Sequence, residues 1–198
     1  MGRINRKVIN EIQDIDNNSE ACASSSTIEI KLFNGTLAKF REVILEDIIA
    51  IEKANVVDEI EAAIRISARC CVKFGDKPGV TPIQIEKLPA RDLNKIGNAL
   101  GTQASVVSSI EERVEITEDY TTYVTLFDGT EVVFRDATVG DIKQARAKSK
   151  LLLEQSAYLA SLLCIKWGND ESISYQGITQ INYKNYQLIG KALNNFFR

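Results

Sequence analysis

The sequence predicts an α+β protein built as a tandem duplication of one small β-hairpin-plus-helices module. Three blocks of residues recur in the same order, and each copy combines an alternating strand pattern with a helical pattern. One block returns after 94 residues and two return after 93. The three pairs are Leu32–Thr36 with Leu126–Thr130, Cys71–Gly75 with Cys164–Gly168, and Ile96–Leu100 with Ile189–Leu193. Chance does not keep three blocks in order at spacings that differ by one residue, so we interpret the chain as one module used twice.

Each copy begins with a predicted β-hairpin. The alternating runs that form its first strand are Thr27–Leu32 and Thr122–Leu126. Asn34-Gly35 and Asp128-Gly129 follow them, and such pairs favour positive φ at both central positions of a two-residue turn. The second strand is expected to run through Phe40 or Phe134.

A helix is predicted after each hairpin. In the second copy Thr138 and Asp141 have the spacing of a capping box, in which each side chain bonds to the backbone of the other residue. In the first copy Ile44 replaces the threonine, but Asp47 keeps its place in the first turn, where a carboxylate favours the helix dipole. The sequence therefore places a helix start at the same point in both copies.

The apolar helical pattern continues through Cys71 and Cys164, so both cysteines are expected to be small buried residues of a helix in a reducing compartment. Gly75 and Gly168 are interpreted as the residues that end this helix. A final helix is predicted after a polar connection, and the two copies of it start near Pro89 and near Asn182.

Four segments follow from these patterns. They are a tail over 1–26 with a short helix suggested by Val8, Ile9 and Ile12, a first module over 27–101, an acidic and helical linker over 102–119, and a second module over 120–198. Each module is large enough to be a small domain.

Composition excludes several classes of function. The chain has no histidine and its four cysteines show no C-x-x-C spacing, which excludes histidine bases and Cys/His zinc sites. No run of apolar residues approaches the ~20 needed to span a membrane. The net charge of −3 argues against nucleic-acid binding, although Arg3, Arg6 and Lys7 form a small basic cluster. We therefore expect no catalytic residues, no cofactor and no metal.

Two charged residues recur in both copies and are the first candidates for a functional site. They are Arg41 and Arg135 at the end of the hairpin, and Asp47 and Asp141 at the start of the helix. The favoured interpretation is an ion pair or cap that fastens the hairpin to the helix. The alternative is a polar anchor for a partner.

Differences between the copies supply the other candidates. Arg65 and Arg69 of the first copy become Tyr158 and Leu162 in the second, and Gln103-Ala104 become Phe196 and Phe197. The favoured interpretation is that this apolar surface packs against the first module or the linker, because large apolar patches are rarely left exposed. The alternative is an interface with another chain, in which aromatic residues are typical anchors.

The segment Phe134–Asp141 and the terminal Phe196-Phe197 pair resemble motifs of a known family, the small phage tail assembly chaperones of contractile and siphophage tails. The first copy matches more loosely, because Glu46 replaces Gly140. The resemblance implies a non-enzymatic helper that binds the tail tube or tape-measure protein in the host cytoplasm while the tail is built.

Two other functions remain open. The chain is alternatively a structural subunit of the virion tail or baseplate, built from two copies of the module. A regulatory or nucleic-acid module acting through the basic amino terminus is the third possibility, and the net charge disfavours it. Homo-oligomer formation stays open in each case.

Overall fold

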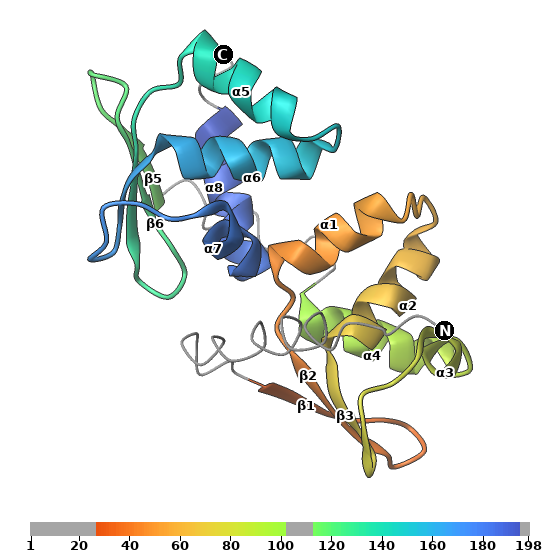
Figure 1. The fold of residues 1–198 in the computed structure, drawn as a ribbon. Helices are drawn as coiled ribbons and strands as arrows, with labels where there is room; N and C mark the ends of the chain where they lie inside the picture. The colour runs from red at the N-terminus through yellow and green to blue at the C-terminus, as the bar shows by residue number, and fades with distance from the viewer. Residues whose placement is uncertain (1–26, 102–112, 195–198) are drawn as a thin grey trace, which may run out of the picture.

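The computed structural model describes residues 27–101 and 113–194, which form two halves that each combine a four-stranded antiparallel sheet with helices (Figure 1). The first half contains β1 (Thr27–Lys31), β2 (Leu37–Arg41), α1 (Leu45–Lys53), α2 (Glu59–Cys70), β3 (Cys71–Phe74), β4 (Lys77–Pro78), α3 (Pro82–Glu86) and α4 (Ala90–Leu100). The second half contains β5 (Val114–Ile116), β6 (Thr122–Thr125), β7 (Glu131–Phe134), α5 (Val139–Lys148), α6 (Leu152–Leu163), β8 (Cys164–Trp167), α7 (Tyr175–Gln180) and α8 (Tyr183–Asn194). The predicted α+β class is confirmed.

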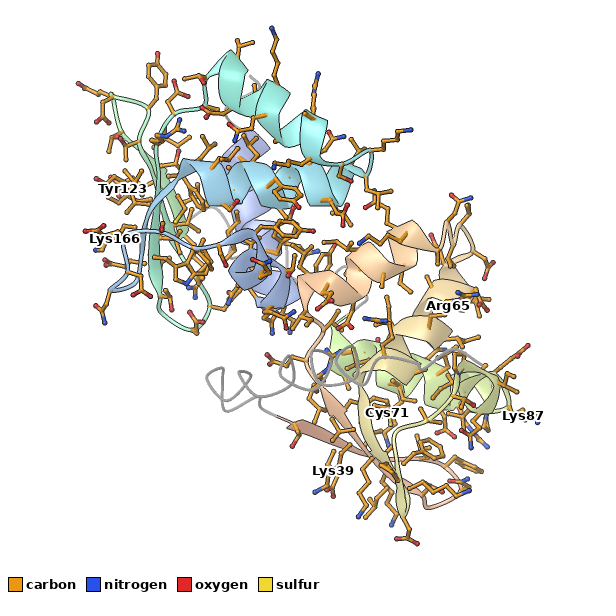
Figure 2. The ribbon with its side chains drawn as sticks, in the orientation of Figure 1. Lys39, Arg65, Cys71, Lys87, Tyr123 and Lys166 are labelled. Carbon is orange, nitrogen blue, oxygen red and sulfur yellow. The ribbon has the colours of Figure 1, made fainter. Side chains whose placement is uncertain are left out.

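The sheets of the two halves share their pairing register. Their strand orders are β1-β2-β3-β4 and β5-β6-β7-β8, so β1, β2 and β3 correspond to β6, β7 and β8. Phe40 lies opposite Cys71 and Phe134 lies opposite Cys164, and a register shift directly precedes each phenylalanine. Both phenylalanines are completely buried. The outer face of each sheet is exposed and carries Lys39 in one half and Lys166 in the other (Figure 2).

The predicted hairpins are present, but their turns differ from the two-residue turn that the sequence suggests. Among the turn residues only Gly35 and Gly129 have positive φ, at 85° and 86°. The side chains of Asn34 and Asp128 instead accept hydrogen bonds from the backbone N–H groups two residues later, at 3.0 and 2.9 Å. This local bond holds the first turn residue in an ordinary conformation and leaves the glycine alone in the left-handed region.

The long helix of each half ends earlier than the sequence predicts. The helices α2 and α6 stop at Cys70 and Leu163, and the next residues, Cys71 and Cys164, begin strands that pair with β2 and β7. Gly75 lies in the turn after such a strand rather than at a helix end. Segments of four residues are too short to be assigned to strand or helix by periodicity, and here pairing with a neighbouring strand decides.

The prediction of a helical linker over 102–119 is also wrong in part. Val114–Ile116 forms strand β5 and pairs with β6, so it belongs to the sheet of the second half. The rest of the predicted linker helix, and the predicted helix near Val8, lie outside the described residues. No helix in the described part of the chain is both long and apolar enough to cross a membrane.

The two halves are joined through helix α1. Leu45 and Ile49 belong to the first half but are buried in the apolar core of the second half, together with residues such as Leu188. The backbone N–H of Leu45 donates to the carbonyl of Ile181 at 3.1 Å, and the N–H of Tyr183 donates to the carbonyl of Val43 at 2.8 Å. Figure 1 shows α1 beside α7 as a result.

Candidate partner-binding site

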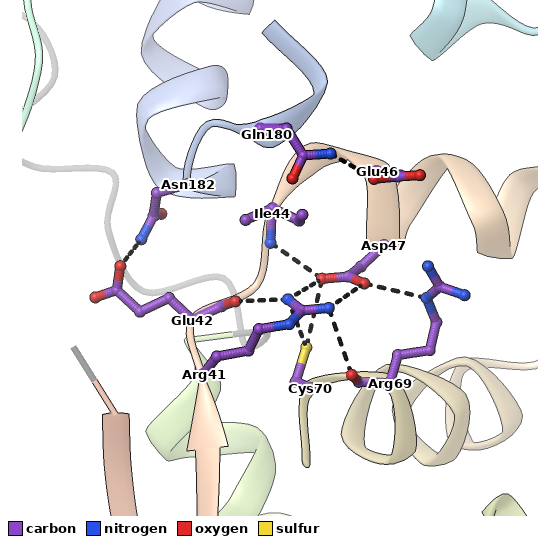
Figure 3. A network of polar contacts seen from close by, with 9 residues as sticks. All are labelled: Arg41, Glu42, Ile44, Glu46, Asp47, Arg69, Cys70, Gln180 and Asn182. Carbon is purple, nitrogen blue, oxygen red and sulfur yellow. Dashed lines mark hydrogen bonds and ion pairs between the residues drawn. The ribbon is translucent and has the colours of Figure 1, made fainter. Parts of the chain in front are cut away.

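The strand–helix corner of the first half is organised around a buried carboxylate (Figure 3). Arg41 donates to both oxygens of Asp47, at 2.6 and 2.8 Å, and the Asp47 side chain has no exposed surface. The backbone N–H of Ile44 donates to the same carboxylate at 3.2 Å, as does Nε of Arg69 at 3.1 Å. The thiol of Cys70 completes the set at 3.5 Å. One carboxylate therefore links the hairpin, the start of α1 and the end of α2.

The charge state of Asp47 follows from these contacts. Burial raises the pKa of its carboxyl, but the hydrogen bonds from Arg41 and from the backbone of Ile44 outweigh burial and leave the pKa below its usual value. The thiol of Cys70 responds in the opposite direction. Burial, reinforced by the Asp47 charge, raises the pKa of Cys70 to about 12. Asp47 is thus ionised and Cys70 is protonated at neutral pH.

The corner of the second half keeps the ion pair and adds the predicted cap. Arg135 donates to both oxygens of Asp141, at 2.8 and 2.9 Å. Thr138 donates to Asp141 through its backbone N–H and its hydroxyl, and its hydroxyl accepts from the backbone N–H of Asp141. The bond from Arg135, first among several, lowers the pKa of the Asp141 carboxyl. Leu162, which replaces Arg69, contributes only its backbone carbonyl, at 3.3 Å from Arg135.

All four recurrent charged residues therefore brace a strand to a helix. This is the ion pair and cap that the sequence analysis favours. A role for Arg41, Asp47, Arg135 or Asp141 in binding a partner stays a prediction.

An open groove of about 340 Å³ lies next to this corner in the first half. It runs between α1, α2 and the start of α3, and its lining residues are Ala50, Ile51, Ala54, Arg65, Ala68, Arg69, Val80 and Pro82. Most of these residues are small or apolar, and the two arginines supply the polar groups. Arg65 projects from α2, where it pairs with Glu61 at 2.5 Å (Figure 2). Arg65 and Arg69 each keep 43% of the side chain exposed.

Two of the equivalent positions in the second half carry aromatic rings. By the 93-residue spacing, Tyr158 and Tyr175 correspond to Arg65 and Pro82. Their rings stack with centroids 3.8 Å apart and planes at 7°. Tyr175 also donates its hydroxyl to Glu154 at 3.2 Å. Two stacked tyrosine rings therefore stand in the second half at the positions where the groove of the first half has Arg65 and Pro82.

The stacked tyrosines lie close to the contact between the halves. Glu154, which accepts from Tyr175, also pairs with Lys53 of α1 at 2.7 Å. The bond from Lys53, ahead of the one from Ser149, lowers the pKa of the Glu154 carboxyl. Three further polar contacts cross between the halves: Gln180 to Glu46 at 2.5 Å, the backbone of Leu152 to Glu52 at 3.2 Å, and Asn182 to Glu42 (Figure 3).

The predicted site residues consequently fall into separate places. Tyr158 packs beside the contact between the halves, Leu162 lies behind the second corner, and Phe196 and Phe197 lie outside the described residues. Tyr175 is absent from the predicted site residues, although it stands 93 residues after Pro82 and that spacing could have identified it.

No group of three or more acidic or cysteine side chains in the described ranges is arranged to hold a metal ion. Comparisons of the chain with protein-family models, with curated proteins and with solved structures found no match.

Proposed function

We propose that this protein is a non-enzymatic tail assembly chaperone, which binds the tail tube or tape-measure protein of a phage while the tail is built. The proposal begins from the resemblance of Phe134–Asp141 to that family. The structural observation that supports it most is a difference between the two halves. One half holds an open groove beside two arginines, and the other carries the stacked rings of Tyr158 and Tyr175 at the positions of two groove residues.

A groove in the first half suits a protein that binds one partner at a time. The groove has the size of many binding sites, and it combines an apolar lining with a few polar groups. Its walls are held in place, because Asp47 ties α1 and α2 together through Arg69. The second half acts in this proposal as a support, since its core accepts Leu45 and Ile49 and so holds α1 from behind.

The alternative is a structural subunit of a phage tail or baseplate. The observation that favours it is the contact between the halves, which combines buried apolar side chains with two backbone hydrogen bonds. Such a contact makes a single block of fixed shape, which a permanent assembly requires.

Co-expression with the tail proteins of the same phage separates the two proposals. For a chaperone we expect a soluble complex with the tail tube or tape-measure protein, found in the host cytoplasm and missing from finished particles. Mass spectrometry of purified particles provides the second measurement. Recovery of the chain from particles at fixed stoichiometry would contradict the chaperone proposal and support a structural subunit of the tail or baseplate.

A further inference from the structure

We propose that the groove between α1, α2 and the start of α3 binds a partner segment in which an aromatic side chain lies beside carboxylates. This inference rests on the proposed function, because it names the site and the chemistry by which the protein holds its partner. It is drawn from the shape of the groove, from its charge, and from the tyrosine rings that the second half carries at two equivalent positions.

The second half shows that aromatic rings fit this architecture. The helices α2 and α3 beside the groove have α6 and α7 as their counterparts in the second half, and the rings of Tyr158 on α6 and Tyr175 on α7 stack with centroids 3.8 Å apart. In the first half the corresponding residues are Arg65 and Pro82, and alanines at positions 50, 54 and 68 contribute to the lining. The first half has no ring at these two positions, so its groove is available to an aromatic side chain from outside.

The positive charge of the groove favours a partner with acidic residues next to that aromatic side chain. Asp47 is already paired on both oxygens with Arg41, so Arg69 brings a positive charge in excess. Among the contacts of the described residues, the guanidinium of Arg69 bonds through Nε alone, and the same holds for Arg65 with Glu61. Their terminal N–H groups are in a position to donate to carboxylates, which guanidinium groups bind with two parallel hydrogen bonds.

The face of α3 that points away from the groove provides a control position. Ile83 is 63% exposed but does not line the groove, so an aromatic residue placed there leaves the groove open. Ile83→Tyr is therefore the matched control for a variant that fills the groove. The filling variant is Arg65→Tyr with Pro82→Tyr, which copies Tyr158 and Tyr175 into the first half.

The direct test uses three capped pentapeptides as probes. They contain glutamate-tyrosine-glutamate, glutamine-tyrosine-glutamine or glutamate-alanine-glutamate between two serines. The methyl groups of Ala50, Ala54 and Ala68, labelled with ¹³C in the full chain, report occupancy of the groove by NMR. We expect the first peptide to shift these methyl signals, and the other two to bind at least tenfold more weakly. Equal shifts with all three peptides, or shifts confined to other parts of the chain, would overturn the proposal.

The variants test the same point from the side of the protein. The filled variant should show no methyl shifts with the first peptide, whereas Ile83→Tyr should bind as the wild type does. Arg65→Gln keeps a donor for Glu61 but removes the charge, and should weaken binding of the first peptide more than that of the glutamine peptide. If the filled variant fails to fold, Arg65→Gln alone tests whether the groove binds the peptide. Unchanged selectivity between the two peptides in Arg65→Gln would contradict the role assigned to the charge.

Co-expression then distinguishes failure of this inference from failure of the proposed function. If the wild type and Ile83→Tyr retain a tail protein and the filled variant loses it, the groove is the binding site. If all three retain it equally, the groove proposal is wrong while the proposed function stands. If none retains a tail protein but the first peptide still binds selectively, the proposed function fails and the chemistry of the groove remains.

Discussion

Leu45 and Val139 occupy equivalent positions at the first residues of α1 and α5, yet Leu45 is completely buried and Val139 is 69% exposed. The difference arises because α1 packs against α7 of the other half. In the same comparison Ile49, which is 3% exposed, corresponds to the exposed Lys143. The same helix face is thus used for the contact between the halves in α1 and faces outward in α5.

Truncating this pair of residues should have unequal effects on stability. Leu45→Ala removes a buried side chain from the core that joins the halves, and should lower the free energy of unfolding by about 2–5 kcal/mol. Val139→Ala should change it by less than about 0.5 kcal/mol, because an exposed side chain loses little packing. Urea unfolding followed by circular dichroism measures both values. Equal effects of the two substitutions would mean that α1 does not pack as the structure shows.

The local features of the fold were predictable from the sequence. The hairpins and the helix starts depend on residues that lie within a few positions of one another, such as Gly35 with its turn and Thr138 with Asp141. Turn and capping chemistry acts at this range, so a single stretch of sequence contains the information.

The predictions that proved wrong concern features that contacts between distant residues determine. Cys71 extends an apolar helical pattern, and only its pairing opposite Phe40 makes it the start of a strand. Leu45 and Val139 are both apolar, and nothing near them in sequence tells which one is buried. The groove could not be predicted from the sequence for the same reason. It forms because the packing of α3 on α2 brings Pro82 and Arg65 together.

Stability should depend on the ionisation of Asp47. Its pKa is lower in the folded state than the usual value of about 4, so the stabilisation by Arg41 is fully present above that pH and is lost as the pH falls through the folded pKa. At pH 7, Asp47→Asn should lower the free energy of unfolding by about 3–5 kcal/mol, because it leaves a buried pair broken. The difference between the wild type and the variant should shrink below about pH 4.

Glu29→Gln provides the control for this measurement. The side chain of Glu29 pairs with Lys39 on the exposed sheet face, and both side chains are about half exposed. Its removal should cost less than about 1 kcal/mol at pH 7. A difference between the wild type and Asp47→Asn that stays constant from pH 7 to pH 3 would contradict the assigned role of the Asp47 charge.

The three cysteines of the described ranges should resist alkylation in the native protein. Cys70, Cys71 and Cys164 are buried free thiols. Burial raises the pKa of Cys70 to about 12 and that of Cys71 to about 11, and it raises the pKa of Cys164 as well. The thiolate is the reactive form, so iodoacetamide at pH 8 should modify these residues far more slowly than in guanidinium chloride. Peptide mass spectrometry at timed intervals measures the rates, and rapid native labelling of Cys70 would refute the buried corner.

In each half, one polar side chain of the last helix holds the turn of the hairpin. Asp92 of α4 accepts a hydrogen bond from the backbone N–H of Phe33 at 3.0 Å, and Asn185 of α8 accepts one from Phe127 at 2.8 Å. The second oxygen of Asp92 is buried and has no hydrogen-bond partner among the described residues. A buried carboxylate oxygen without a partner destabilises the fold, whereas the amide in the second half does the same task without a charge.

Replacing Asp92 by asparagine should therefore keep or increase stability. Asp92→Asn retains the acceptor for Phe33 and removes the charge, so we expect the free energy of unfolding to stay within about 0.5 kcal/mol of the wild type or to rise. Asp92→Ala leaves the N–H of Phe33 without its partner and should cost about 1–3 kcal/mol, as should Asn185→Ala in the other half. Denaturant unfolding of the three variants measures these values. If Asp92→Asn proves as harmful as Asp92→Ala, the negative charge itself stabilises the hairpin and the comparison with Asn185 is misleading.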